Sequence, residues 1–329
     1  MARVVRFHET GGPEVLRVET LDAGEPGPGE ALVRIEAIGL NRAEAARRGG
    51  HYIVKPPLPA RLGAEATGVI VKLGPDSGDW AVGDAICTTP NGGLVQPGVY
   101  ASEVVLPLAG MLRRPEGLAP EQAASVWVAF FTAWGGMVET GGLAKGEFVI
   151  IPAASSGVGL AAVQIASDLG AIPIAATRRS DKAQALRDAG AAHVVATEEQ
   201  DLKAEVARIT DGKGVRLIFD PVAGPFAETL FECLTDDGVL MIYGGMANLP
   251  ATFPRQLAIR RNLTMRGYNF FTMLNDPARR AAAYDYIWAR LKDGRFRMPV
   301  AKVFALEDVV EAHRYLESNQ HVGKVVMRP

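Results

Sequence analysis

The chain has 329 residues, of which 48% are hydrophobic and 22% are charged, and these proportions exclude a mainly disordered, collagen-like or coiled-coil protein. Lys and Arg number 35 and Asp and Glu 37, so the formal net charge of -2 gives no overall attraction to nucleic acid or to an anionic membrane surface. Glycine accounts for 36 of the 329 residues, a larger share than its usual ~7%. Its abundance directs attention to places where the backbone turns or approaches a ligand closely.

The cysteines and the apolar stretches of the chain indicate in which cellular compartment the protein is expected. Cys87 and Cys233 form no Cys-x-x-Cys pair, so we predict buried reduced thiols, with one bridge between them as the alternative, and no cysteine-built zinc site. Residues Met1 to Thr10 contain no signal-peptide core. The longest apolar stretch, Val126 to Trp134, is shorter than the ~18 residues of a membrane span. We therefore expect a cytoplasmic protein without a membrane partner.

The first third of the chain has the pattern of β structure. Residues Leu32 to Ile38 alternate between apolar and polar side chains, and Gly68 to Leu73 alternate more weakly. Turn-forming clusters separate the runs, at Glu25–Gly29, Gly83–Asp84 and Asn91–Gly93. Short strands between such turns predict a β-rich region over residues 1–120.

From about Ala119, apolar strands alternate with helix-length segments. Strands are predicted at Phe148–Ile151, Ile172–Ala176, His193–Val195, Val215–Phe219, Gly238–Tyr243 and Leu263–Arg266. Helices are predicted between them at Gly157–Leu169, Asp181–Ala189, Asp201–Thr210 and Pro225–Leu234. Because parallel strands need a crossover helix, this order predicts an α/β fold with a doubly wound parallel sheet, a Rossmann domain, over residues 121–267.

The tail, residues 268–329, is expected to rejoin the β-rich region as the second part of one domain. It contains two amphipathic helices, Pro277–Lys292 and Leu306–Ser318, and a final strand, Lys324–Met327. The predicted layout is a β-rich domain with a Rossmann domain inserted into it.

A small-residue turn after the first Rossmann strand is the sharpest local signal. Such a turn, which opens a helix, is where backbone N–H groups and the helix dipole bind the pyrophosphate of a dinucleotide. Ala154 and Ser156 stand where the G-x-G-x-x-G fingerprint has its first two glycines. The residues predicted to contact the cofactor here are Ser155, Ser156, Gly157 and Val158.

The end of the second Rossmann strand favours NADPH over NADH. An NAD site places an acidic residue there to bind the ribose 2′-hydroxyl. This chain instead has Thr177, Arg178, Arg179 and Lys182, and Asp181 is expected to cap the following helix. Guanidinium and ammonium groups suit a dianionic 2′-phosphate, so we predict NADPH as the cofactor. A solvated basic loop is the alternative interpretation.

These features follow an order that resembles the medium-chain dehydrogenase/reductases, specifically their zinc-independent quinone oxidoreductase branch. The resemblance covers nearly the full length and is carried by Gly11–Leu16, Ile38–Asn41, Leu62–Gly68, Val82–Asp84, Phe131–Trp134, Ala154–Gly159, Gln164–Ala166 and Val322–Val326. It implies a GroES-like catalytic domain beside the Rossmann domain. It also implies a homodimer, joined here through the edge strand Leu263–Arg266.

The resemblance further implies that no metal is bound. Zinc-containing alcohol dehydrogenases of the same superfamily bind their catalytic zinc through a Cys and a His, at positions that hold Asn41 and Ala64 here. An alanine cannot ligate a metal and a neutral amide is a poor zinc ligand. The nearby His51 is expected to be a surface or hydrogen-bonded residue.

Without a metal, conjugate reduction is the least demanding reaction for such a site. Hydride adds to a quinone or to the β-carbon of an enone, and the charge spreads over an enolate that hydrogen bonds stabilise. The resemblance thus implies an NADPH-dependent reductase of small-molecule quinones or α,β-unsaturated carbonyls, with no nucleic-acid partner.

Site residues follow from the resemblance, motif by motif. Asn41 and Tyr52 match the family's site asparagine and tyrosine and are the predicted catalytic residues, although Asn41 also suits the cap of the helix that follows it. The further positions expected to contact the cofactor are Thr132, Tyr243, Gly244, Gly245, Asn269, Phe270 and Lys324.

Two alternative functions remain open at the level of sequence. An enoyl-thioester or alkenal reductase shares the cofactor and the hydride geometry, and Arg255, Arg260 and Arg261 are candidates to hold a phosphopantetheine phosphate. A nucleotide-binding redox sensor with little turnover is the other alternative, because the sequence has no unambiguous acid or nucleophile.

Overall fold

A computed structural model describes residues 1–90 and 98–329; the predicted turn at Asn91–Gly93 lies outside these residues. The chain divides into two compact units. The first unit comprises residues 1–128, 274–277 and 298–329, and the second comprises residues 129–273 and 278–297. No helix in the described part of the chain is both long enough and apolar enough to cross a membrane.

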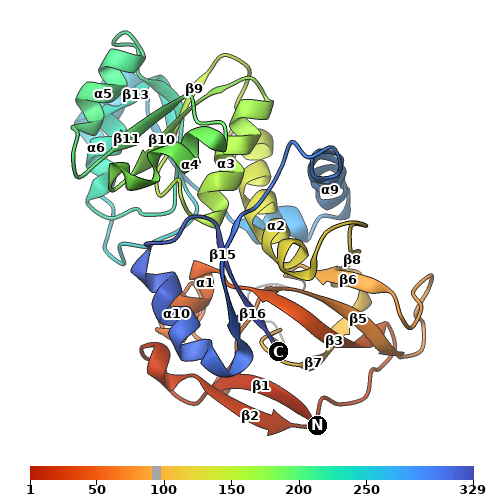
Figure 1. The fold of residues 1–329 in the computed structure, drawn as a ribbon. Helices are drawn as coiled ribbons and strands as arrows, with labels where there is room; N and C mark the ends of the chain where they lie inside the picture. Colours follow the sequence, from red (N-terminus) through yellow and green to blue (C-terminus); the bar gives the residue numbers. More distant parts are fainter. Residues whose placement is uncertain (91–97) are drawn as a thin grey trace. The chain divides into compact units, whose positions relative to one another are not determined.

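The first unit is built around two sheets of mainly antiparallel strands (Figure 1). The smaller sheet has the order β2-β1-β4 and contains β1 (Ala2–Phe7), β2 (Arg17–Leu21) and β4 (Ala60–Arg61). The larger sheet has the order β15-β16-β3-β5-β6-β8, with β7 also paired to β3. Its members are β3 (Glu30–Gly39), β5 (Glu65–Leu73), β6 (Ala85–Thr88), β7 (Glu103–Pro107), β8 (Met111–Arg113), β15 (Val300–Ala305) and β16 (Lys324–Arg328). The predicted return of the tail is therefore observed, since β16 pairs with β3.

Two helices complete the core of the first unit. These are α1 (Arg42–Arg48) and α10 (Val309–Ser318), and the apolar side chains of α10 pack in one cluster with those of β1, β3 and β5. Helix α2 (Pro120–Ala133) begins in this unit. Its backbone lies so close to Gly39 that an added Cβ would be 1.9 Å from the carbonyl oxygen of Ala124. A side chain at position 39 would therefore separate α2 from the sheet.

The second unit contains the predicted parallel sheet. Its order is β11-β10-β9-β12-β13-β14, which is the doubly wound arrangement 3-2-1-4-5-6. The strands are β9 (Phe148–Ile151), β10 (Ile172–Thr177), β11 (His193–Ala196), β12 (Val215–Asp220), β13 (Leu234–Ile242) and β14 (Thr264–Gly267). The sequence predicted all six strands because continuous apolar runs between helices are typical of buried parallel strands.

Helices cover this sheet. They are α3 (Gly157–Asp168), α4 (Ala183–Asp188), α5 (Leu202–Ile209), α6 (Phe226–Glu232) and α7 (Arg255–Arg261). Apolar side chains of α5, α6 and α7 share one cluster with β9, β10, β12 and β13. Helix α2 continues into a π-helical segment, Trp134–Thr140, and α8 (Phe270–Leu274) follows β14.

The sequence analysis assigns helix α9 (Pro277–Lys292) to the β-rich domain, with all residues after 267. In the structure, residues 278–297 belong to the second unit. Tyr286 and Arg290 of this helix both bind Asp168 at the end of α3, with Tyr286 Oη 2.8 Å from Asp168 Oδ2. Gln164 of α3 donates to the carbonyl oxygen of Arg297 at 2.9 Å. These bonds attach the segment to α3, and no local sequence pattern predicts them.

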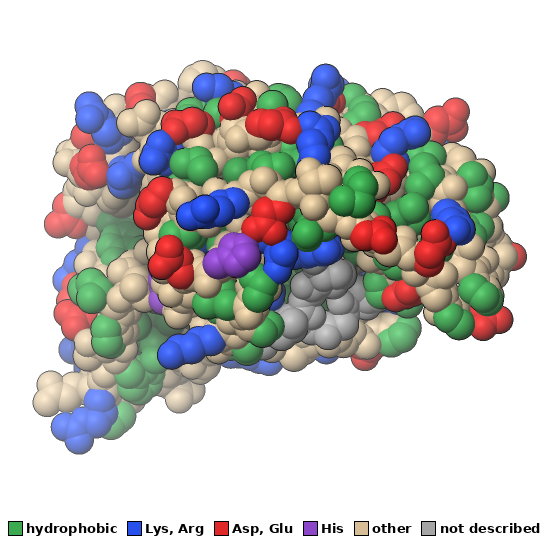
Figure 2. All heavy atoms as spheres, turned by 90° about the horizontal axis from the view of Figure 1, so that it is seen from below, with side chains coloured by type: hydrophobic (Ala, Val, Ile, Leu, Met, Phe, Trp, Pro, Cys, Tyr) green, Lys and Arg blue, Asp and Glu red, His purple; other side chains and the backbone are tan. Residues whose placement is uncertain are grey.

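The surface agrees with the composition. On the face shown in Figure 2, acidic and basic side chains are interspersed and no broad patch of one sign is visible. This distribution fits the formal net charge of -2.

Candidate functional site

The phosphate turn (Ala153–Gly159) joins β9 to α3. Ala153 has a φ of +48°, a left-handed conformation that few alanines adopt. Ser156 is the N-cap of α3, and its Oγ accepts from the backbone N–H of Gly159 at 3.1 Å. Since the first N–H groups of a helix have no acceptor within the helix, those of Gly157 and Val158 are available to an anion.

The same turn requires glycine at position 159. A Cβ there would lie 2.5 Å from the carbonyl oxygen of Ala153 and 2.6 Å from that of Ala154. Gly159 thus allows the helix start to pack on the turn, as the fingerprint's last glycine does. In this turn the left-handed conformation is adopted by Ala153, which precedes the first of the two positions without glycine.

The basic loop (Arg178–Lys182) lies at the carboxyl end of β10. Lys182 Nζ is 3.4 Å from Ser155 Oγ, so the loop contacts the phosphate turn. Burial, together with the charge of Arg178, lowers the pKa of Lys182, while Asp181 opposes this shift. Arg178 and Arg179 are exposed, whereas Thr177 is buried and its carbonyl oxygen accepts from the backbone N–H of Thr197 at 2.8 Å. The structure brings together Ser155 and Lys182, and it leaves the two guanidinium groups at the surface.

The ends of β13 and β14 hold further predicted cofactor residues. The Tyr243 ring stacks on Phe219 with centroids 4.0 Å apart, and its hydroxyl is buried with no hydrogen-bond partner among the described residues. A buried hydroxyl of this kind is a natural partner for a ligand or a water molecule. A Cβ on Gly244 would meet the carbonyl oxygen of Pro221 at 2.8 Å, whereas one on Gly245 would meet nothing within 4 Å.

Asn269, Phe270 and Thr132 have more local surroundings. Asn269 caps α8, because its Oδ1 accepts from the backbone N–H of Phe271 at 3.0 Å. The ring of Phe270 meets that of Phe271 edge-on. Thr132 is buried in the last turn of α2, before the π-helical segment.

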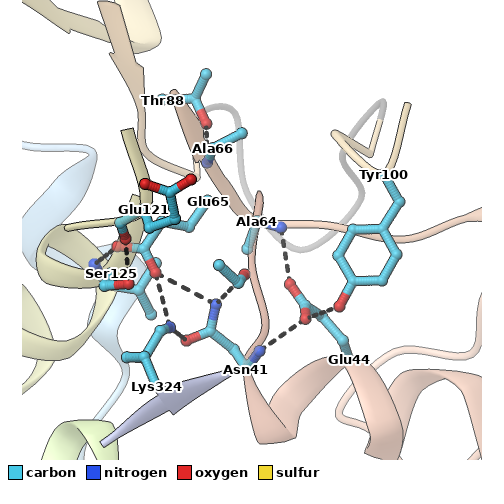
Figure 3. A network of polar contacts seen from close by, with 12 residues as sticks. Asn41, Glu44, Ala64, Glu65, Ala66, Thr88, Tyr100, Glu121, Ser125 and Lys324 are labelled. Atoms are coloured by element: carbon cyan, nitrogen blue, oxygen red, sulfur yellow. Dashed lines mark hydrogen bonds and ion pairs between the residues drawn. The ribbon is translucent and has the colours of Figure 1, made fainter. Parts of the chain in front are cut away.

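In the first unit, a buried ion pair lies on one side of Asn41 (Figure 3). Lys324 Nζ lies 2.8 Å from Asn41 Oδ1 and 2.9 Å from Glu65 Oε2. The side chains of Lys324 and Glu65 are 4% and 0% exposed. Asn41 is also the N-cap of α1, which confirms that part of the sequence interpretation, and its catalytic role stays a prediction.

A second carboxyl group, that of Glu44, binds the backbone of Asn41. Glu44 accepts hydrogen bonds from the backbone N–H groups of Asn41 at 2.8 Å and Ala64 at 2.9 Å, and from Tyr100 Oη at 2.5 Å. Burial raises the pKa of Glu44, although the hydrogen bond from Tyr100 opposes the shift. Figure 3 shows Glu44 and Tyr100 on the opposite side of Asn41 from Lys324. This carboxyl group therefore fixes the two backbone positions that carry Asn41 and Ala64.

Tyr52 interacts electrostatically with Arg47 and Glu44. Burial raises its pKa, Arg47 lowers it and Glu44 raises it further. The phenol hydroxyl of Tyr52 can donate a hydrogen bond.

Sequence reasoning did not single out Glu44, Glu65 or Tyr100 as site residues. The available signal was Glu65, an acidic residue that opens the mainly apolar strand β5. A charged side chain in such a strand is rarely buried unless it is paired. Of the arginines considered for a phosphopantetheine phosphate, Arg261 instead binds Asp236, with Nε 2.9 Å from Oδ1.

The donor set does not suit a metal ion. Within residues 1–90 and 98–329, no group of three or more His, Cys, Asp or Glu side chains could hold one. Asn41 occupies one expected ligand position and Glu65 follows the other, Ala64, in the chain; Asn41 Oδ1 and Glu65 Oε2 both accept from the Lys324 ammonium. Because a cationic side chain already neutralises this carboxylate, a divalent ion would have to displace it.

Two sequence families match the chain. Residues 27–116 match the alcohol dehydrogenase GroES-like domain, and residues 157–285 match the family described as zinc-binding dehydrogenase. The first match lies within the first unit, and the second lies within the second unit except for residues 274–277.

Individual relatives match over the whole length. A quinone oxidoreductase of Pseudomonas aeruginosa is 31% identical over 333 residues, which cover 100% of each chain. A 2-haloacrylate reductase of a Burkholderia species is 29% identical over 336 residues, covering 100% of this chain and 99% of the relative. The crystal structure of Escherichia coli quinone oxidoreductase complexed with NADPH superposes with a TM-score of 0.93, at 27% identity and 100% coverage of both chains.

Proposed function

The chain belongs to the medium-chain dehydrogenase/reductases, in their quinone oxidoreductase-like branch, and from this membership we propose that it is an NADPH-dependent oxidoreductase that reduces a quinone or an α,β-unsaturated carbonyl compound. The observation that carries this proposal is the contact between the basic loop and the phosphate turn, Lys182 Nζ to Ser155 Oγ at 3.4 Å. It places a cation beside N–H groups that can bind a pyrophosphate.

The residues of the second unit fit NADPH. The N–H groups of Gly157 and Val158 would bind the pyrophosphate, and Arg178 and Arg179 would bind the 2′-phosphate. The orphaned Tyr243 hydroxyl and the open space at Gly245 suit close approach of a ligand at the end of β13. The matched Escherichia coli structure, which contains NADPH, supports the same assignment.

The first unit would serve the substrate. NADPH, when bound, supplies the hydride. Tyr52 would donate a hydrogen bond or a proton to the oxygen that becomes negative, and the Asn41 amide would donate a hydrogen bond to the same oxygen. Both groups are neutral donors, which suits an enolate whose charge is already delocalised.

We extend the proposal to zinc independence. The name of one matched family mentions zinc, but Asn41 and Ala64 stand at the predicted ligand positions and Lys324 neutralises the nearest carboxylate. We derive no step through a metal. Full turnover after dialysis against a strong chelator would support this part of the proposal, and restoration of activity by added zinc would contradict it.

The principal test is the oxidation of NADPH in the presence of a panel of quinones, enones and enoyl-CoA esters. We expect turnover with quinones or simple enones. Binding of NADPH without turnover on any member of the panel would contradict the proposed reaction and favour a sensor. Preferential turnover of enoyl-CoA esters would favour the thioester reductase. Of the arginines considered for its phosphopantetheine phosphate, Arg261 is bound to Asp236, which leaves Arg255 and Arg260 as the candidates.

Assembly and location complete the proposal. We propose a homodimer formed through β14, which is an edge strand of its sheet, with Met265 and Ile259 37% and 77% exposed nearby. A monomeric mass in light scattering at micromolar concentration would contradict it. We also propose a cytoplasmic location, in keeping with two free, buried cysteines, which cell fractionation would test.

A further inference from the structure

Lys324 is the buried cation of the first unit whose role the proposed reaction does not yet define. The sequence predicts a contact between Lys324 and the cofactor, and in the structure its Nζ binds Asn41 and Glu65. Its side chain is 4% exposed. A lysine this deeply buried has to be held by partners, and here both partners are known.

The sheet brings these three residues together. Strands β16, β3 and β5 are neighbours, and Gly39 near the end of β3 is the register partner of both Glu65 and Val326. Lys324 and Glu65 therefore begin the two strands that flank β3, and Asn41 follows the end of β3. The arrangement is a property of the strand order and does not depend on a flexible loop.

Glu65 is fully engaged on both oxygens. Its Oε1 accepts from the backbone N–H of Val128 at 3.0 Å, and its Oε2 accepts from Lys324 at 2.9 Å. The carboxylate thus anchors the ammonium and is itself anchored to α2. This leaves the ammonium close to the Asn41 oxygen, with little freedom to move.

The ammonium determines which way the Asn41 amide faces. Asn41 Oδ1 accepts from Lys324 at 2.8 Å, and Nδ2 donates to the carbonyl oxygen of Gly39 at 3.2 Å. The reversed amide would place an NH₂ group against an ammonium and an oxygen against a carbonyl oxygen, which is repulsive at both ends. A cation on the amide oxygen also polarises the amide and makes its N–H groups better donors.

One hydrogen of this amide remains weakly held. The contact from Asn41 Nδ2 to Glu65 Oε2 is 3.5 Å, longer than the modal N–H···O distance of about 3.0 Å. A carbonyl oxygen of a ligand can therefore take this hydrogen without breaking a strong bond.

We propose that Lys324 is a positioning residue, which orients and polarises the Asn41 amide so that Nδ2 donates to the carbonyl oxygen of the substrate. This inference rests on the proposed function for the identity of the ligand. It assigns to Lys324 an action through Asn41, with no direct contact to the reacting atoms.

A double-mutant cycle tests whether Lys324 acts through Asn41. We expect Lys324→Met to lower kcat for the preferred quinone or enone by about tenfold or more, and to do so by less than about twofold when Asn41 is already alanine. The Kd for NADPH should change little in all variants. An equal loss in both backgrounds would overturn the proposal, because Lys324 would then act independently of Asn41.

A second readout does not require turnover. In protein labelled with ¹⁵N-asparagine, the side-chain amide signals of Asn41 are identified by their loss in Asn41→Ala. Removal of the ammonium in Lys324→Met should shift these signals, and unchanged signals would overturn the proposal. If the wild-type protein turns over no substrate, the proposed reaction fails, whereas this NMR result still decides how Lys324 acts on Asn41.

Stability has to be separated from positioning. Arg48→Met removes another buried cation of the first unit, whose NH1 lies 2.8 Å from Glu317 Oε1. We expect this control to lower the melting temperature with little effect on the kcat of the folded fraction. If Lys324→Met does not fold, Lys324→Gln replaces it, since glutamine removes the charge and keeps a donor. A fall in kcat matched by Arg48→Met at equal loss of stability would overturn the proposal.

Discussion

The phosphate turn of the second unit and the polar network of the first unit hold their polar groups in different ways. Around Ser155, the first N–H groups of α3 have no acceptor within the helix, and Arg178 and Arg179 are exposed. Around Asn41, the carboxylates and the ammonium bind one another, and Glu65 and Lys324 are almost wholly buried. The first region, which we call the open region, is suited to bind a charged group, because its N–H groups lack acceptors. The second, which we call the closed region, is suited to hold a few donors rigidly. The predictions below test this difference, from the largest expected effect to the smallest.

The largest effect is expected at the glycines of the two regions. Gly39→Ala would place a Cβ 1.9 Å from the Ala124 carbonyl oxygen, so we expect the free energy of unfolding to fall by more than ~4 kcal/mol. Gly245→Ala, which meets nothing within 4 Å, should change that energy by less than ~0.5 kcal/mol and should weaken NADPH binding. Denaturant unfolding measures the stability of both variants, and titration with NADPH measures their affinity for the cofactor. Similar stabilities for the two variants would contradict the distinction between a closed and an open region.

The pH dependence of stability should come from the first unit, where His313 is buried beside Arg48. Burial, with the charges of Arg48 and Arg42, lowers the pKa of His313 from 6.5 to about 3. Because the folded pKa is the lower one, His313 contributes stability above pH 6.5 that is lost as the pH falls, at up to about 1.4 kcal/mol per pH unit. Urea unfolding between about pH 7 and pH 4 should show a flatter profile for His313→Gln.

The control for this measurement is His51→Gln, at an exposed histidine. This variant should keep the wild-type pH profile. Parallel profiles for the wild type and His313→Gln would show that His313 does not remain neutral in the folded protein.

The open region should control the choice of nucleotide. We expect NADPH to bind at least about tenfold more tightly than NADH, a difference of ~1.4 kcal/mol. Replacement of both Arg178 and Arg179 by alanine should narrow that difference, because the guanidinium groups would no longer bind the 2′-phosphate. Fluorescence titration with both nucleotides measures the ratio. Equal affinities in the wild type would contradict the assignment.

The smallest effect is expected at Ser156. Its Oγ caps α3 by accepting from Gly159, so Ser156→Ala should lower the free energy of unfolding by ~1 kcal/mol. NADPH affinity should fall by no more than about threefold, since the backbone N–H groups do most of the phosphate binding. A large loss of affinity with unchanged stability would instead indicate a direct bond from the hydroxyl to the phosphate.

Local patterns predicted the open region and most of the fold. The apolar runs gave the six parallel strands, and the turn from Ala154 to Gly159 gave the start of α3. Such features depend on neighbouring residues, so a sequence displays them directly. The left-handed conformation of Ala153 was not predictable, because alanine has no preference for it.

The closed region depended on distant pairs and was predicted only in part. Asn41 and Lys324 were both named, but their mutual bond spans 283 positions in the chain. Glu65 and Lys324 are 259 positions apart, and Tyr100 and Glu44 are 56 apart. No periodicity encodes which buried charges meet, so these pairs required the strand order of the folded unit.

The pairing of β16 with β3 has a consequence for how the protein is made. The parallel sheet of the second unit uses strands between residues 148 and 267, so it can fold while the ribosome is still adding the tail. The Asn41 network needs Lys324, which is synthesised 283 positions after Asn41. During synthesis, Glu65 therefore lacks its cationic partner until β16 has left the ribosome and pairs with β3.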